Sequence, residues 1–264
     1  MSKIVTIHSV RKGRGKSQIA ANMAVQWAGE GQRIALIDAN ILAPTMKGLF
    51  NRMDWETPSL EDYLLDRCNI EDAAYDVTNA LSLSARDAKH GVRGQLFLLS
   101  SVGEPADIFG LLHAGFPTER FSEGLADLDS HLALDKMIVE CPAGLAEETL
   151  TFLALSDSLG IVMFLDQREY QGTGATLEVA RRLDVHDVAI LVNDVPAVFD
   201  YDQVRSEVSE TYDCPVTVLP HSEELLTMAG RGIFIQEYPE HPLSNALRQA
   251  AATLTAWTDS VEPS

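Results

Sequence analysis

Cysteine is scarce in this chain. Cys68, Cys141 and Cys214 are the three cysteines among 264 residues, and they are widely spaced with no CxxC pair. An odd number at such spacing disfavours a disulfide framework and a cysteine-based metal site. We therefore expect three reduced thiols and a cytoplasmic protein.

Long hydrophobic runs are also missing, although 46% of the residues are apolar. No stretch combines the length and the freedom from charge that a membrane span needs. A strand pattern begins close to Met1, so we expect no signal or transit peptide ahead of the fold. Length and composition predict one large α/β domain over residues 1–258, followed by a short acidic tail over 259–264.

Basic residues are few: 20 Lys and Arg stand against 39 Asp and Glu, which gives a formal net charge of −19. A surface that coats DNA needs clustered Lys and Arg, so DNA is not expected as the main partner. The last predicted helix, 243–257, has Arg248 as its only basic residue, which disfavours stable membrane binding. The acidity is equally typical of an adaptation for solubility, including solubility at high salt.

One motif carries chemistry: Gly-Lys-Ser lies between a strand pattern and a helix pattern. β-branched residues dominate 3–8, and small apolar residues recur at helical spacing over 17–27. The segment 9–17, SVRKGRGKS, therefore opens a helix whose free N–H groups and dipole favour an anion. In such a loop Lys16 reaches the terminal phosphates and the Ser17 hydroxyl holds Mg²⁺, which predicts a magnesium nucleotide. A surface turn rich in Gly and Lys is the simpler alternative.

Strand-like and helical segments alternate along the rest of the chain. This pattern predicts an α/β fold with a single doubly wound, mostly parallel sheet flanked by helices. Strands are predicted at 4–8, 33–38, 96–100, 136–140, 160–165, 188–193 and 215–219. Helices are predicted at 17–27, 59–65, 118–131, 147–155, 174–183, 202–212, 222–230 and 243–257. The least regular stretches, 85–94 and 101–117, are predicted to be loops.

Several predicted strands end in a polar residue, namely Asp38, Glu140, Asp166 and Asn193. Ligands of an open parallel sheet bind beyond the carboxyl ends of its strands, so we expect these side chains to converge beside the loop. A single residue of this kind is ordinarily a helix cap or a turn former. Their repetition favours a functional site.

Taken together, these segments resemble the MinD/ParA family of deviant Walker A ATPases along nearly the whole chain. The family loop Lys-Gly-Gly-x-Gly-Lys-Thr/Ser aligns with 11–17, and the Asp-x-Asp switch segment aligns with 38–40, followed by Pro44-Thr45. The Walker B strand and the switch after it align with 136–144, KMIVECPAG. Residues 191–195, LVNDV, match the strand whose Asn recognises adenine, and 219–222, LPHS, match the loop over the base.

The resemblance implies a P-loop NTPase fold with an ATP/ADP and Mg²⁺ site. It places nucleotide contacts on Lys12, Gly13, Arg14, Gly15, Lys16, Ser17, Gln18, Asn193, Pro220 and His221. It places the Mg²⁺ ligands on Ser17, Asp38 and Glu140, and the catalytic roles on Arg11, Lys16, Asp38 and Asn40. In the family, the residue at position 11 reaches across a nucleotide-sandwich dimer to the partner's phosphates. A nucleotide-dependent homodimer is therefore implied.

The chain departs from the family pattern at four positions. Arg11 replaces a Lys but keeps the charge, and its planar fork can clamp phosphate oxygens. Lys12 replaces a Gly and adds bulk where unusual backbone torsions are expected. Glu140 replaces the Walker B Asp with a side chain one methylene longer. Asn40 replaces the carboxylate that orients the attacking water, and since an amide cannot accept a proton, hydrolysis should be slow.

Each candidate position also has a simpler interpretation. Asp38 would cap a turn, Asn40 would adopt a left-handed turn conformation and Glu140 would pair with a nearby base. Asn193 would be an ordinary residue at a strand end. Cys141 is interpreted as a buried thiol rather than a nucleophile, because no His is near it in the sequence.

These features predict a cytoplasmic, magnesium-dependent ATP-binding switch that dimerises and hydrolyses ATP slowly. By resemblance it would position or regulate a protein assembly, through a protein partner that the sequence does not identify. The main alternative is a scaffold that is stabilised by ATP without hydrolysing it, which Asn40 favours. An iron–sulfur carrier is a further alternative, disfavoured because the chain has no CxxC.

Overall fold

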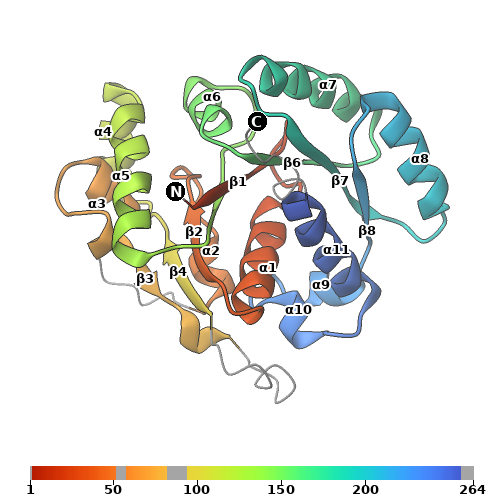
Figure 1. Ribbon diagram of the computed structural model, residues 1–264, viewed down its shortest axis with the longest axis horizontal. Coiled ribbons are helices and arrows are strands. Elements are labelled where there is room, and N and C mark those ends of the chain that lie inside the picture. The colour runs from red at the N-terminus through yellow and green to blue at the C-terminus, as the bar shows by residue number, and fades with distance from the viewer. Residues whose placement is uncertain (1, 52–57, 82–93, 257–264) are drawn as a thin grey trace, which may run out of the picture.

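The strand-forming segments join into one eight-stranded sheet within the residues that the computed structural model describes, which are 2–51, 58–81 and 94–256 (Figure 1). The strands are β1 (Lys3–His8), β2 (Arg33–Asp38), β3 (Tyr75–Asp76), β4 (Gln95–Leu99), β5 (Lys136–Glu140), β6 (Ser158–Met163), β7 (Asp187–Val195) and β8 (Val216–Pro220). Their order is β3-β4-β2-β5-β1-β6-β7-β8, and every neighbouring pair is parallel except β3 with β4. The predicted mostly parallel sheet is confirmed.

Helices connect the strands and cover both faces of the sheet (Figure 1). They are α1 (Lys16–Gly29), α2 (Met46–Leu49), α3 (Leu60–Leu64), α4 (Pro105–Ala114), α5 (Thr118–Leu132), α6 (Glu147–Ala154), α7 (Gln167–Arg182), α8 (Tyr201–Tyr212), α9 (Glu223–Thr227), α10 (Phe234–Glu237) and α11 (Pro242–Ala256). Two short 3-10 turns, Glu71–Ala73 and Thr78–Ala80, flank β3. No helix in the described ranges has the length and apolar character to cross a membrane.

Alternate residues of the central strands enter different hydrophobic cores, because neighbouring side chains on a strand point to opposite faces. On β2, Ile34 and Leu36 pack in a core with α1 and α11, whereas Ala35 and Ile37 pack in a core with α3 and α5. A third core lies between strands β6 to β8 and helices α7 and α8. Since both faces are buried, these strands are almost continuously apolar in sequence.

The register of the three central strands brings their carboxyl ends together. Strand β5 lies between β1 and β2, and Glu140 at its end is paired with Ile7 on one side and with Asp38 on the other. The chain leaves β1 beside Glu140 and enters α1 at Lys16. The expected convergence of polar strand ends beside the loop is thus found for Asp38 and Glu140.

Helix α4 lies inside the stretch 101–117 that we predicted to be a loop, so that prediction is wrong. Pro105 occupies the first turn, where its missing N–H costs nothing. Leu111 is buried in the core with α3 and α5, and Asp107 is held by both terminal nitrogens of Arg67 at 2.7 and 2.6 Å. Tertiary contacts therefore stabilise a helix whose glycine content locally argues against one.

Helix α7 begins at Gln167, seven residues before the predicted start at Gly174. Asp166 caps it by accepting a hydrogen bond from the Arg168 N–H at 2.9 Å, so this strand-end residue is a helix cap and not part of a converging site. Position 172 within α7 is a glycine, and a Cβ there would come within 2.5 Å of the Val10 side chain. The helix approaches the loop after β1 too closely for a larger residue.

Other differences from the prediction are short elements: β3, α2 and α10 were not expected. The predicted loop 85–94, apart from Gly94, lies outside the described residues, as do Trp257 and the acidic tail 259–264.

Candidate functional site

The loop after β1 lines part of a cavity of about 790 Å³ with its residues 12–18. Its lining includes the predicted loop residues Lys12, Gly13, Arg14, Gly15, Lys16, Ser17 and Gln18, together with Asn40 and Glu140. Gly13 and Gly15 have φ values of 75° and 86°, a region that glycine enters without steric cost. A Cβ at Gly15 would also lie 2.6 Å from Asn193 Nδ2, so a larger residue would add a close contact to the strain of the positive φ. Lys12 is not among the residues with positive φ, so its bulk requires no unusual torsion.

Lys16 supplies positive charge to this cavity from a buried position. The residue is 6% exposed, and its Nζ donates to the Ser9 hydroxyl at 3.1 Å. Within the described ranges no carboxylate forms an ion pair with it. A buried ammonium group without a counter-ion favours an anionic ligand, as do the free N–H groups where α1 begins.

Oxygen-bearing side chains meet at the end of β5. The Ser17 hydroxyl donates to Glu140 Oε1 at 2.8 Å, and the Thr45 hydroxyl donates to Ser17 Oγ at 2.8 Å. Glu140 Oε2 is buried without a hydrogen-bond partner in the part of the chain that is described. Mg²⁺ binds hard oxygen ligands and usually takes only one or two from the protein, with phosphate oxygens and water completing its shell. The Ser17 and Glu140 oxygens fit this ion.

Asp38 does not line the cavity; it holds the segment that follows β2. It is fully buried and accepts hydrogen bonds from the N–H groups of Thr45 and Met46 at 2.9 and 3.2 Å. These contacts agree with the simpler interpretation of Asp38 as a residue that caps a turn. Glu140, in contrast, has no ion pair with a base among the described residues, and its partner is the Ser17 hydroxyl.

Burial shifts the ionisation of both carboxyl groups. Desolvation raises the pKa of Asp38 to about 6, against the opposing effect of its backbone hydrogen bonds. Desolvation and then the negative charge of Asp38 raise the pKa of Glu140 to about 8. The charge of Lys16 and the Ser17 hydroxyl oppose this shift without cancelling it, so a divalent ion beside the two carboxyl groups would favour their ionised forms.

The comparisons with known proteins agree with this geometry. No family model matches the chain. The chain is 25% identical over 256 residues to an uncharacterized ATP-binding protein of Methanocaldococcus jannaschii, a match that covers 96% of this chain and 88% of the relative. A putative septum site-determining protein MinD of Chlorella vulgaris is 21% identical over 241 residues, which cover 88% of this chain and 77% of that protein.

A solved structure extends the match to the whole fold. The septum site-determining protein MinD of Pyrococcus horikoshii OT3, complexed with Mg-ADP, superposes with a TM-score of 0.77 at 17% identity, covering 97% of this chain and 96% of that one. The chain has the fold of this MinD structure and is similar in sequence over most of its length to ATP-binding proteins and to a MinD. The predicted resemblance is thus confirmed.

Two loop arginines share one buried carboxylate. Arg14 donates to Glu169 Oε1 through Nε at 3.0 Å, and Arg11 Nε lies 3.6 Å from the same oxygen. The Glu169 side chain is fully buried, whereas that of Arg11 is 42% exposed. The sequence analysis did not identify Glu169, which lies in the first turn of α7. The Nε atom of Arg11 thus faces Glu169, while part of the Arg11 side chain is exposed to solvent.

Asn40 lines the cavity but its amide is engaged in its own turn. Asn40 Nδ2 donates to the carbonyl of Ala43 at 3.1 Å. The expected left-handed conformation is not found, because Asn40 is absent from the residues with positive φ. The structure therefore places this side chain beside the cavity and shows it stabilising the segment between β2 and α2.

The residues predicted to contact a base are divided between two places. Asn193 Nδ2 donates to the Arg14 carbonyl at 2.9 Å, so this residue touches the loop directly. None of Asn193, Pro220 and His221 lines the cavity. His221 pairs with Asp194, Nδ1 to Oδ1 at 2.6 Å, just beyond the carboxyl ends of β7 and β8. The base contacts therefore remain predictions.

Cys141 has a histidine neighbour that its sequence position concealed. His8 Nδ1 lies 3.2 Å from Cys141 Sγ, because β1 and β5 are adjacent. Burial raises the pKa of the Cys141 thiol well above its usual range, whereas burial and then the charge of Lys16 lower the pKa of His8 to about 4. His8 is 133 positions from Cys141 in the sequence and contacts it only in the fold, and a neutral imidazole beside a protonated thiol agrees with the interpretation as a buried thiol.

The raised carboxyl pKa values predict that the ligand-free protein loses stability as the pH rises. The fold favours protonated Glu140, so its stability contribution is complete below the ordinary carboxyl pKa and is lost as the pH rises through about 8. Each pKa unit corresponds to about 1.4 kcal/mol, so the loss amounts to a few kcal/mol. We expect Glu140→Gln to raise Tm at pH 8 and to flatten the decline of Tm between about pH 5 and pH 8.

Thermal melts without nucleotide or metal check this expectation. Glu30→Gln, at a surface residue, serves as the matched control and should follow the wild-type pH profile. A Glu140→Gln variant whose Tm declines with pH as steeply as that of the wild type would contradict the assignment of the pH dependence to Glu140.

Proposed function

We propose that this chain is a magnesium-dependent ATP-binding switch that forms a homodimer around ATP and hydrolyses it slowly. The observation that carries the proposal is the glycine-bent loop that presents buried Lys16 and the Ser17 hydroxyl to the cavity beside Glu140. The Mg-ADP bound to the Pyrococcus horikoshii protein, and ATP binding by the Methanocaldococcus jannaschii relative, support the choice of nucleotide.

The side chains of the site divide the work between binding and switching. Lys16 neutralises phosphate charge, while Ser17, Asp38 and Glu140 would hold Mg²⁺ directly or through water. When bound, Mg²⁺ supplies positive charge that neutralises phosphate oxygens. Because Ser17 is hydrogen-bonded to Thr45, whose N–H is held by Asp38, occupation of the site bears directly on residues 38–45.

The second switch segment is tied to the loop by its backbone. The Gly144 N–H donates to the Ser9 carbonyl at 3.0 Å, so the segment 140–144 is joined directly to the start of the phosphate loop. Segments held in this way can adopt one arrangement with ATP and another without its γ-phosphate. The nucleotide state would then select a protein partner, and we place this function in the cytoplasm.

Arg11 is the residue that we propose to act across the dimer. Its exposed guanidinium can pair bidentately with phosphate oxygens of a nucleotide bound to a second copy. We expect Arg11→Ala to remain monomeric in ATP and Mg²⁺ by light scattering, because the new interface loses its charge-neutralising contact. Arg182→Ala, at an exposed arginine near the end of α7, is the control and should dimerise as the wild type does. A stable ATP-dependent dimer of Arg11→Ala would refute the role in trans.

A second candidate function is an ATP-stabilised scaffold without hydrolysis. The Asn40 side chain favours this function. Its amide donates a hydrogen bond to the Ala43 carbonyl, and an amide cannot accept a proton from the attacking water as a carboxylate can. Single-turnover release of γ-phosphate, measured with and without cell lysate, separates the two functions. Release by the purified protein would defeat the scaffold, and binding without release under either condition would defeat the slow ATPase.

A further inference from the structure

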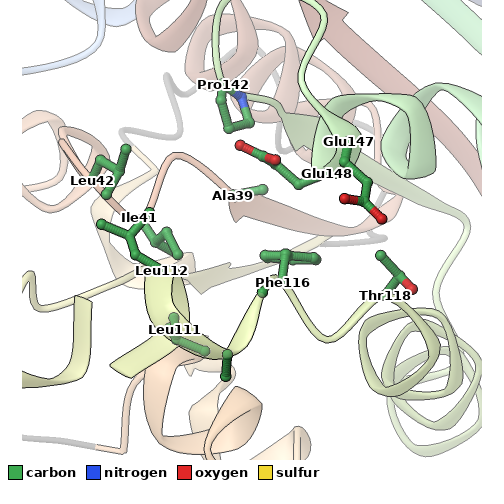
Figure 2. Close-up of a pocket in the computed structure, with 12 residues that line it drawn as sticks. Ala39, Ile41, Leu42, Leu111, Leu112, Phe116, Thr118, Pro142, Glu147 and Glu148 are labelled. Carbon is green, nitrogen blue, oxygen red and sulfur yellow. The ribbon is translucent and has the colours of Figure 1, made fainter. Parts of the chain in front are cut away.

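A second cavity, of about 370 Å³, lies beside the two switch segments and shares no lining residue with the nucleotide cavity (Figure 2). Its volume lies within the range of small binding pockets. Apolar side chains line most of it, from Ile41 and Leu42 after β2, from Leu112 and Phe116 at the end of α4, and from Pro142 after β5. We call this cavity and the exposed face of α4 around Phe109 and Leu112 the α4 groove.

The α4 groove exposes more apolar surface than its place in an acidic protein explains. Phe109, Leu112 and Leu42 are 70%, 62% and 45% exposed. Helix α4 carries a single acidic residue, Asp107, and that carboxylate is engaged by Arg67. Isolated apolar side chains are normal on a surface, but a contiguous group with a hollow beside it marks a binding surface.

One rim of the groove is negatively charged. The carboxylates of Glu147 and Glu148, in the first turn of α6, lie across the cavity from Ile41 and Leu112 (Figure 2). Neither carboxylate has a hydrogen bond or an ion pair with any residue that the structure describes. The groove thus combines an apolar floor with two uncompensated negative charges, which suits a ligand with a bulky apolar group beside a cation.

The groove is built on the segments that the nucleotide controls. Ile41 and Leu42 lie between Asp38 and Thr45, and Pro142 lies in the segment 140–144. The two segments are joined directly, because the Ala39 N–H donates to the Glu140 carbonyl at 3.0 Å. A rearrangement of either segment therefore reshapes the groove, and a ligand of the groove favours one nucleotide state.

We propose that the α4 groove docks a short amphipathic segment of a partner protein, with a bulky apolar side chain in the cavity and a Lys or Arg paired with Glu147 and Glu148. A protein segment fits better than a small molecule because the apolar surface continues from the cavity along α4 to Phe109, which is not a lining residue. The link to nucleotide state rests on the proposed function, whereas binding in the groove does not.

The test uses the full chain in ATP and Mg²⁺ and a phage-displayed library of random dodecapeptides as the probe. We expect enriched peptides to carry Lys or Arg next to Leu, Phe or Trp. Synthesised peptides should bind Leu112→Asp and the double variant Glu147→Gln/Glu148→Gln at least about tenfold more weakly than the wild type, as loss of a central apolar contact or a charge pair predicts. Val198→Asp, at an 86%-exposed residue before α8, is the matched control and should bind as the wild type does.

Several results would overturn the proposal. These are a failure to enrich any peptide, peptides that bind all variants equally, and peptides with no basic residue that are indifferent to Glu147→Gln/Glu148→Gln. Loss of the ATP-dependent dimer in Leu112→Asp, with no peptide enriched, would instead assign the groove to a second copy of the chain. Flotation of the wild type, but not of Leu112→Asp, with phosphatidylcholine vesicles would assign it to a lipid surface.

A separate readout distinguishes this proposal from the proposed function. Leu112→Asp and the glutamine variant should bind a fluorescent ATP analogue as the wild type does, since none of the three residues lines the nucleotide cavity. Suppose that the wild type binds no ATP, but that Leu112→Asp still weakens the binding of the enriched peptides. The proposed function would then be wrong, whereas the proposal of a docking groove would be supported.

Discussion

Lys16→Ala is expected to weaken the binding of ATP about a hundredfold or more, which in practice abolishes it at micromolar concentrations. The Lys16 ammonium is the buried positive charge of the cavity, and a charge-assisted hydrogen bond of this kind is worth about 1.5–3 kcal/mol, before its added electrostatic attraction for the other phosphates. Equilibrium binding of a fluorescent ATP analogue in Mg²⁺ measures the effect.

Lys3→Ala is the matched control, because Lys3 begins β1 at the opposite end of the strand from the loop. It should bind the analogue as the wild type does. Without nucleotide, Lys16→Ala should be at least as stable as the wild type, since it removes a buried charge that forms no ion pair with a carboxylate in the part of the chain that the structure describes. Unchanged affinity in a folded Lys16→Ala would mean that the nucleotide binds elsewhere.

Asn40→Asp is expected to accelerate the hydrolysis of bound ATP about a hundredfold. A carboxylate at this position can accept a proton from water, which the amide cannot, and general-base catalysis contributes rate effects of about this size or greater. The carboxylate also cannot donate to the Ala43 carbonyl as the amide does, so repulsion turns it away from that carbonyl and toward the cavity. Single-turnover release of γ-phosphate measures the change.

Asn40→Gln provides the control for this experiment because it keeps the amide and changes only the length of the side chain. It should hydrolyse ATP no faster than the wild type. If Asn40→Asp binds ATP but releases phosphate at the wild-type rate, another residue orients the water and Asn40 is not the cause of slow turnover.

The sequence predicted the parts of this fold that local patterns determine. Seven of the eight strands were placed because buried parallel strands are nearly continuous apolar runs, and β3 was missed because it has two residues. The prediction failed where distant contacts outweigh local preference. Helix α4 depends on the burial of Leu111 and the Arg67–Asp107 pair, and α7 tolerates Gly172 because the helix packs against Val10.

The candidate site shows the same division. The loop motif predicted which residues line the cavity, since glycine positions and the loop's Lys and Ser follow from the backbone that binds phosphate. The pairing of β1 with β5 and β6 was not visible in the motif. That pairing brings His8 to Cys141, and the close packing of α7 on the loop brings Glu169 to Arg11 and Arg14. Such contacts join residues more than a hundred positions apart, where a single sequence gives no signal.

A calorimetric titration of the full chain with ATP in the presence of Mg²⁺ tests the central claim most directly. The structure predicts saturable binding of one ATP per chain, with an increase in Tm that disappears when Mg²⁺ is chelated or Lys16 is replaced by alanine. The absence of both heat and thermal stabilisation at millimolar ATP would contradict the assignment of a nucleotide site to this loop.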